Sequence, residues 1–412
     1  MENIWMKKII SLIALCLVAA TLFTACGGGE TTDPTLDPTI SIDETGAPAD
    51  EPAGDPTNSA TQAPSQNATS GATTKPSSTA TTNPSATATS KPKADIDLRF
   101  SSTGKFKILI LSDLRLSKSV DKTIISNLEK MLDKVKPDLV ILGGDVHNGT
   151  ISNEADLRKV LDAVNAPLES RKIPWCHAFG VDAEGTATKK TGYKKADQMK
   201  VYQSYPYCIS EASASDVYGV SNYVLPIKQA TGNKVGFNVW CMDANGYLND
   251  YEAGLEDKVM VSNMLSGKTN LDCIHFTQRL WYWNTSIEMQ KANSGSNVPG
   301  MLYTQVPPYQ FRYIYRNPDR TGMTGTAKEK QSSPERDSGI IWTAYERNDI
   351  KGIFCGYNEA NDYQGTYLNM VLAQCSTIGK SDYEATRGGR VVELTNNGSK
   401  MTTSMVYLKD LK

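Results

Sequence analysis

The chain has 412 residues and a formal net charge of −2, with eight cysteines and only three histidines. A chain this close to neutrality, without a strong basic cluster in its folded part, gives no sign of a nucleic-acid surface. We therefore exclude nucleic acid as a partner. No C-x-x-C pair occurs among the cysteines.

The first 26 residues have the pattern of an export signal. Lys7 and Lys8 precede an apolar run from Ile9 to Leu22, and small residues lead up to Cys26. The run is too short to favour a spanning helix, which needs about 20 apolar residues. Cys26 follows Thr-Ala and precedes three glycines, which is similar to a bacterial lipoprotein signal, in which this cysteine is lipidated and becomes the mature N-terminus. The alternatives are an ordinary signal peptide and an uncleaved anchor.

Residues 27–93 consist mostly of Thr, Ser, Ala, Pro and Gly, with hardly a large apolar side chain. Such a segment cannot bury enough surface to offset its ordering entropy, which predicts a disordered linker. As a flexible coil it would span roughly 45 Å on average. We therefore expect a lipid-anchored protein on the extracytoplasmic face of a bacterial cell membrane, on a Gram-positive surface, with residues 94–412 as the folded domain.

The folded part begins with a strand, a helix and a second strand. The apolar run Phe106–Leu111 ends at Ser112-Asp113, and the run Leu139–Leu142 ends at Gly143-Gly144-Asp145. Apolar residues at helical spacing lie between them, from Val120 to Val135. Open α/β sheets place polar groups beyond the carboxyl ends of their strands, so we expect Asp113 and Asp145 to face one crevice.

The later elements continue an α/β pattern and end in strands. We expect helices at 157–168, 196–203, 278–293 and 343–347, and strands at 173–179, 223–227, 235–242, 301–305, 350–356, 366–372, 390–394 and 402–408. Ser119 is the expected N-cap of the first helix, and Ser152 or Asn153 that of the second. We expect a long surface loop at Pro307–Pro334. Within it, aromatic residues alternate from Tyr309 to Tyr315, which indicates a strand face or a stacking strip.

Six cysteines remain beyond the signal segment. Several of them lie in apolar runs, so we expect buried free thiols, although export would permit disulfides. The six are Cys176, Cys208, Cys241, Cys273, Cys355 and Cys375.

Seven segments, in chain order, resemble the calcineurin-like metallophosphoesterases, especially the branch related to purple acid phosphatases. They are residues 106–115 (FKILILSDLR), 137–145 (PDLVILGGD), 174–184 (PWCHAFGVDAE), 278–282 (QRLWY), 304–308 (TQVPP), 352–362 (GIFCGYNEAND) and 389–394 (GRVVEL). The resemblance implies an α/β fold in which a two-sheet β-sandwich is flanked by helices, in α/β/β/α layers. It also implies a centre in which two divalent metals, held by Asp, Asn and His, activate a water for attack on phosphorus.

Most residues that would hold those metals are replaced in this chain. Arg115 stands for the histidine of the first motif, Gln305 for that of the His-x-Pro motif, and Tyr357 and Glu359 for the two histidines of the last motif. The turn after Gly180 is one residue short, so the Asn ligand and the catalytic histidine are both missing. The degenerate metal-site positions are Asp113, Arg115, Asp145, Asp182, Gln305, Tyr357 and Glu359. We therefore expect no resident metal and assign no catalytic residue.

None of the three histidines falls on a ligand position of the family. We expect structural roles for His177 and His275. His147, which follows Asp145 by two residues, is a candidate for an additional site role, and so are Asn148 and Asn358. Asn358, Glu359 and Asp145 could alternatively hold a single Ca²⁺ or Mg²⁺, because hard cations take oxygen ligands.

Two buried carboxylates without a metal would repel each other, and one would tend to protonate. Arg115 lies two residues from Asp113 and offers a bidentate positive partner. We hypothesise an internal Asp113–Arg115–Asp145 cluster, with a solvent-exposed Arg115 side chain as the alternative.

The sequence thus predicts a surface lipoprotein whose phosphoesterase-like domain has lost its dinuclear metal site and binds a wall polymer, a polysaccharide or a protein. The alternative is an active metal-dependent phosphodiesterase or phosphatase with atypical ligands for Mn, Fe, Zn or Ca. Aromatic residues near predicted loops favour the binding role; they are Trp281, Tyr282, Trp283, Tyr309, Tyr313 and Tyr315.

Overall fold

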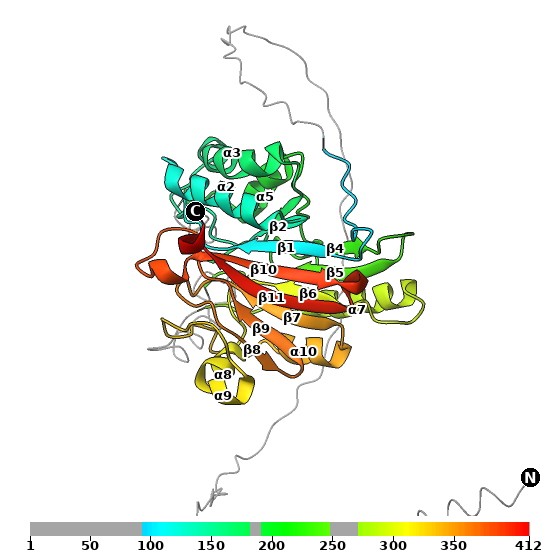
Figure 1. Cartoon of the computed structure of the whole chain (residues 1–412). Coiled ribbons are helices and arrows are strands. Elements are labelled where there is room, and N and C mark those ends of the chain that lie inside the picture. Colours follow the sequence, from blue (N-terminus) through cyan, green and yellow to red (C-terminus); the bar gives the residue numbers. More distant parts are fainter. Residues whose placement is uncertain (1–92, 182–190, 248–270, 412) are drawn as a thin grey trace, which may run out of the picture. The chain divides into compact units, whose positions relative to one another are not determined.

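The computed structural model describes residues 93–181, 191–247 and 271–411 (Figure 1). The predicted signal segment, nearly all of the predicted linker and Asp182 lie outside these ranges. Among the described helices, none has the length and apolarity needed to cross a membrane.

One sheet has five strands in the order β11-β10-β1-β2-β3. Its parallel strands are β1 (Phe106–Leu111), β2 (Leu139–Leu142) and β3 (Trp175–His177). The chain returns to this sheet at its end, where β10 (Gly388–Thr395) pairs antiparallel with β1 and with β11 (Lys400–Tyr407). Three helices pack on it: α2 (Lys122–Val135), α3 (Glu154–Ser170) and α5 (Lys195–Gln203).

The other sheet has six strands in the order β4-β5-β6-β7-β9-β8. The strands are β4 (Tyr223–Lys228), β5 (Val235–Cys241), β6 (Gly300–Tyr303), β7 (Ile350–Cys355), β8 (Gln364–Tyr367) and β9 (Met370–Gln374). The four inner strands run parallel, and the two edge strands run antiparallel to their neighbours. The helices of this half are α7 (Phe276–Ala292), α8 (Phe311–Arg316), α9 (Pro318–Thr321) and α10 (Ile340–Arg347).

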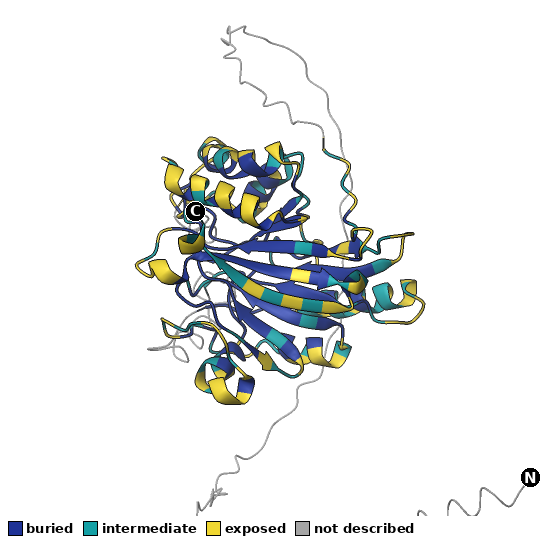
Figure 2. Ribbon diagram, in the orientation of Figure 1, coloured by how far each residue is buried: buried dark blue, intermediate teal, exposed yellow. Residues whose placement is uncertain are grey.

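The strand β1 shows how the layers are built. Phe106, Ile108 and Ile110 belong to the apolar cluster shared by the two sheets, whereas Leu109 and Leu111 belong to the cluster under α2, α3 and α5. This alternation follows from the two-residue period of a strand with both faces buried. Figure 2 shows most strands buried, whereas exposed residues lie on the outer sides of the helices, in loops and along β11. The predicted α/β fold, a two-sheet sandwich flanked by helices, is confirmed.

The first helix begins later than predicted. Its N-cap is Asp121, whose carboxylate accepts a hydrogen bond from the amide of Thr123 at 2.8 Å, so the prediction of Ser119 was wrong. Val120, predicted as helical, has a φ of 48° and lies outside the helix. An aspartate caps as well as a serine does, and its charge adds to the attraction of the helix N-terminus. Asn153 caps α3, as expected.

The region predicted as a long surface loop, Pro307–Pro334, contains α8 and α9. Of the two alternatives for Tyr309–Tyr315, the strand face was wrong, because most of this stretch lies in α8; the stacking strip stays a prediction. Phe311 and Ile314 are buried three residues apart, as on one side of a helix, while Tyr313 is exposed. The alternation of aromatic residues therefore reflects no strand.

The predicted strand 366–372 is in fact a hairpin of β8 and β9. Leu368 and Asn369 form its turn with φ values of 48° and 60°, and β9 pairs antiparallel with β8 and parallel with β7. Tyr282, expected near a loop, is buried in α7 and donates a hydrogen bond to Asp349. The six cysteines are buried free thiols, as predicted.

Candidate functional site

Asp113 and Asp145 lie directly beyond β1 and β2, and both side chains are fully buried. Each has a left-handed backbone, with φ of 55° and 48°, as have Arg115 (48°) and Tyr357 (70°). Residues other than glycine rarely take this conformation, and it clusters at functional sites. The Arg115 amide donates to the Asp145 carbonyl at 2.8 Å, which joins the two strand-end loops. The backbone conformation of these four residues is therefore typical of a functional site.

Three donors surround the carboxyl group of Asp113. The Nε2 of Gln305 lies 2.8 Å from Oδ1, while the Ser112 hydroxyl and the Tyr357 amide donate to Oδ2 at 2.5 and 3.1 Å. Gln305 is itself buried, and its Oε1 accepts the amide of Val181 at 2.8 Å. Gln305 thus links the β1 end to the turn after β3 by hydrogen bonds.

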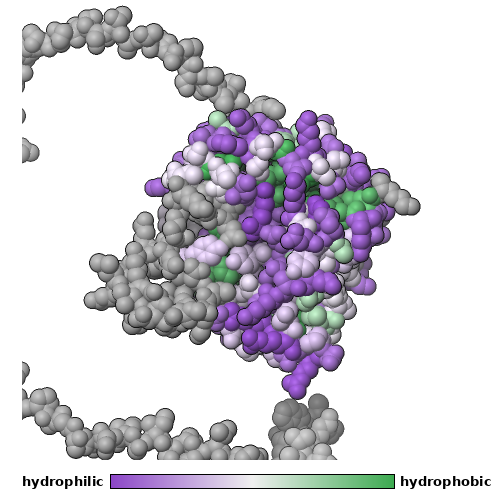
Figure 3. Space-filling view, turned by 90° about the vertical axis from the view of Figure 1, so that its left-hand side faces the viewer, coloured by the Kyte–Doolittle hydropathy of each residue, from purple (hydrophilic) through white to green (hydrophobic). Residues whose placement is uncertain are grey.

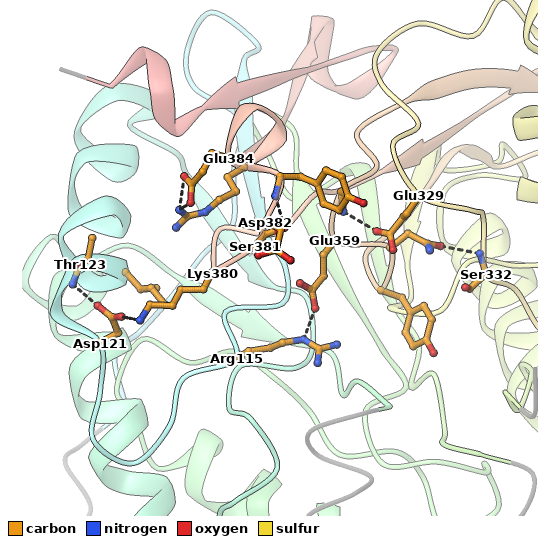
Figure 4. Close-up of a pocket in the computed structure, with 16 residues that line it drawn as sticks. Arg115, Asp121, Thr123, Glu329, Ser332, Glu359, Lys380, Ser381, Asp382 and Glu384 are labelled. Carbon is orange, nitrogen blue, oxygen red and sulfur yellow. Dashed lines mark hydrogen bonds and ion pairs between the residues drawn. The ribbon is translucent and has the colours of Figure 1, made fainter.

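Within the described part of the chain, Arg115 contacts Asp145 and Glu359. Its Nη2 lies 3.4 Å from Oδ2 of Asp145. Its Nε lies 2.6 Å from Oε1 of Glu359 (Figure 4). The Asp145 side chain is fully buried, whereas those of Arg115 and Glu359 are 34% and 25% exposed. The predicted cluster is therefore right for Asp145 and needs correction for Asp113, whose place is taken by Glu359. A side chain directed only into solvent is excluded.

The pKa of the Asp113 carboxyl lies far above the usual range of an aspartate. Burial raises the pKa of its carboxyl from 3.8 to about 8, and the charge of Asp145 adds to this, whereas Arg115 and the Ser112 hydrogen bond act in the opposite direction. At neutral pH Asp113 is therefore mostly neutral. The raised pKa of Asp113 agrees with the expectation that one of the two acids, Asp113 or Asp145, is protonated.

His147 and Asn148 have local partners. The Nε2 of His147 hydrogen-bonds with Gln198 at 3.0 Å, and its Nδ1 accepts the amide of Gly149 at 3.2 Å. Burial lowers the pKa of this histidine, so it is neutral. The exposed Asn148 accepts hydrogen bonds from Thr150. These hydrogen bonds support structural roles for His147 and Asn148 instead of the site roles expected from the sequence.

The predicted single-cation site of Asn358, Glu359 and Asp145 does not form. The amide of Asn358 is turned to the segment 330–332, where it accepts from Gln331 and Ser332 and donates to Lys330. Glu359 and Asp145 both contact Arg115, whose guanidinium has no lone pair for a metal. Within the described ranges no group of three or more His, Cys, Asp or Glu side chains is arranged to hold a metal ion. Asp182 lies outside those ranges.

Two glycines, which the sequence analysis did not identify as site residues, allow neighbouring loops to pack closely around the two aspartates. A Cβ atom on Gly180 would lie 2.5 Å from Oδ1 of Asp145 and 2.6 Å from Oε1 of Gln305. A Cβ atom on Gly356 would lie 2.7 Å from Oδ2 of Asp113. Such approaches exclude any side chain. Glycines directly after apolar strands were the signal that could have identified them.

The crevice opens into a surface hollow of about 920 Å³ whose lining includes Arg115, Tyr357 and Glu359. It is formed by residues 121–124, 329–332, 357–360 and 380–387. Figure 4 shows how the labelled side chains face one another across it. Figure 3 shows the molecule from the left-hand side of Figure 1, where the surface is mostly hydrophilic.

Comparisons with known proteins agree with this geometry. No family model matches the chain. Over 318 residues it is 27% identical to "Probable inactive purple acid phosphatase 14" of Arabidopsis thaliana, which covers 69% of this chain and 73% of that protein. Over 319 residues it is 25% identical to "Probable inactive purple acid phosphatase 29" of the same plant, covering 69% and 75%.

Among solved structures, a dimetal phosphatase from Danio rerio superposes with a TM-score of 0.51 at 9% identity, covering 74% of this chain and 96% of that one. At 9% identity this likeness shows a shared fold and nothing about activity. The chain is thus similar in sequence to purple acid phosphatase-like proteins and shares its fold with a dimetal phosphatase.

Proposed function

We propose that this protein is a non-catalytic metallophosphoesterase homologue that acts as a binding module. The observation that carries the proposal is the position of the Arg115 guanidinium, which contacts both Asp145 and Glu359. A guanidinium stays protonated and cannot ligate a metal, so its charge takes over the neutralising role that metals have in the family.

The remaining side chains of the crevice support the same conclusion. Gln305 directs an N–H donor, not a lone pair, at Asp113. His147 and His275 are engaged by Gln198 and Asp272. The residues present therefore do not fit a dinuclear centre that relies on imidazole ligands. Two of the relatives carry names that describe them as probably inactive, which agrees with the proposal.

Hydrolysis without metals would need a base and a group that stabilises charge on phosphorus. Arg115 could stabilise such charge, but the raised pKa of Asp113 leaves this acid protonated at neutral pH. Asp145 and Glu359 are held by Arg115 itself. The crevice thus offers no free base beside its cation among the described side chains.

We expect the purified protein to hydrolyse bis(p-nitrophenyl) phosphate in added Mn²⁺ no faster than a protein-free blank. The Asp145→Asn variant should give the same blank rate. An unrelated active metallophosphatase, assayed in parallel, controls for the reagents. Turnover by the wild type that Asp145→Asn abolishes would contradict the proposal and support an active phosphodiesterase or phosphatase with atypical ligands.

We further propose that a lipid on Cys26 anchors the protein to the outer side of the cell membrane and that residues 27–93 act as its tether. The signal pattern before Cys26 and the composition of the tether support this. Growth of a Gram-positive host with an alkyne fatty acid should label the wild type and the control Cys16→Ser. Label retained in Cys26→Ser would contradict the proposal.

A further inference from the structure

We propose that the hollow beside Arg115 binds an oligosaccharide that carries neither phosphate nor carboxylate groups. This inference rests on the proposed binding function and names its ligand class. The volume of about 920 Å³ lies at the upper end of the range for ligand pockets, roughly 300–1,000 Å³. A ligand larger than a single sugar ring therefore has room.

The positive charges that line the hollow are matched within it. Arg115 pairs with Glu359 at 2.6 Å, Lys380 with Asp121 at 2.7 Å, and Arg387 with Glu384 at 2.7 Å (Figure 4). Asp121 is also the N-cap of α2, so one carboxylate serves both the helix terminus and Lys380. An anionic ligand would have to compete with these carboxylates for each cation.

Two further acids, Glu329 and Asp382, line the same hollow. Among the described residues of the lining, five side chains are acidic and three are basic, which leaves a formal charge of −2. Charges of one sign in a concave site repel a ligand of the same sign. The hollow therefore disfavours phosphate-rich wall polymers and acidic polysaccharides, and it accepts uncharged or amine-bearing sugars.

Planar polar groups of the lining are held in fixed orientations. A Glu329 oxygen accepts the amide of Ala360 at 2.7 Å, and a Glu359 oxygen lies 2.6 Å from Nε of Arg115. Groups whose rotation is already restricted lose little entropy when they bind a ligand. Carboxylates and guanidinium groups offer the paired acceptors and donors that neighbouring sugar hydroxyls can use.

Two tyrosines add an apolar element to this polar lining. Tyr383 is 44% exposed, and Tyr357 is half-buried next to the Asp113 loop. An aromatic ring offers a large apolar face together with a polar tip, which suits a ligand with C–H faces and hydroxyl edges. Sugars have both features, whereas a purely apolar ligand would leave the ionised lining without partners.

The test is binding of the purified full-length protein to a glycan array that carries uncharged, amino-sugar and phosphate- or carboxylate-bearing oligosaccharides. We expect signal on the first two groups only. Tyr383→Ala should reduce that binding at least tenfold, because it removes the exposed ring. The matched control is Tyr345→Ala, which removes a ring that is 46% exposed on α10 and should change binding less than twofold.

Three outcomes would overturn the inference: no binding to any glycan, binding confined to anionic glycans, or equal binding by Tyr383→Ala and the wild type. Circular dichroism of both variants confirms that they are folded. A failure here leaves the non-catalytic proposal intact, since that depends on hydrolysis. Conversely, phosphodiester turnover would contradict the non-catalytic proposal whatever the array shows.

Discussion

Replacing Arg115 by alanine should lower the free energy of unfolding by about 3 kcal/mol, because it leaves Asp145 buried without its cation. Removing one partner of a buried ion pair costs roughly 3–5 kcal/mol, and the partial exposure of Arg115 places the value at the lower end. Glu359 loses a partner as well, but its exposure reduces that share. Urea unfolding of the full chain measures the change.

The matched control is Arg171→Ala. Arg171 is 30% exposed, much as Arg115 is, but its partner Asp133 is 66% exposed, so the loss should stay below about 1 kcal/mol. The double variant Arg115→Met with Asp145→Asn should recover most of the lost stability, since neither member of this ion pair is then charged. Equal effects of Arg115→Ala and Arg171→Ala would show that Arg115 is an ordinary surface side chain.

The second large effect is on the pH dependence of stability. Relative to Asp113→Asn, the wild type should lose about 1.4 kcal/mol per pH unit as the pH rises from about 4 to about 8. The unfolded carboxyl releases its proton near 3.8 and the folded one near 8, so the folded state binds more protons in this window. Below and above it, the difference between the two proteins should be constant.

The measurement is a series of urea titrations of both proteins between pH 4 and pH 9. The slope of the difference with pH is the test, because the constant offset also contains the altered hydrogen bonds with Gln305 and Ser112. Asp121→Asn is a useful comparison. The pKa of Asp121 is lowered to about 2, so its contribution is present at neutral pH and lost on acidification. A wild type that becomes more stable than Asp113→Asn as the pH rises would contradict the assignment.

The fold could be predicted where hydrophobic periodicity was strong. The runs of β1 and β2 and the amphipathic α2 were evident because their apolar residues face two distinct layers. The hairpin of β8 and β9 was missed because its turn, Leu368-Asn369, has no glycine to signal a positive φ. The helix α8 was missed because its buried side depends on packing partners that are distant in sequence.

The site could be predicted only in part for a related reason. Strand-end position brought Asp113 and Asp145 together, and charge suggested Arg115 as their partner. The sequence could not tell which acid Arg115 would contact. In the structure, Glu359 from the loop after β7 lies beside Arg115, and Gln305 donates its hydrogen bond to Asp113. Local spacing favoured Asp113 over Glu359, but the tertiary arrangement of the loops decided the pairing.

If the protein is non-catalytic, as we propose, this arrangement would let the crevice stay folded without metals. The left-handed backbones of Asp113, Arg115 and Asp145 are fixed by bonds between loops, among them the one from Thr377 Oγ1 to the Asp113 carbonyl at 2.6 Å. The guanidinium of Arg115 and the amide of Gln305 then satisfy the acids.

We propose that Arg115, and not a metal, neutralises the acids of the crevice. Anomalous diffraction at the manganese absorption edge, from crystals soaked in Mn²⁺, tests this most directly. We expect no anomalous peak within coordinating distance of Asp113 or Asp145, and we expect the Arg115 guanidinium to contact Asp145 and Glu359. One or two peaks between these acids, with Arg115 displaced, would contradict it.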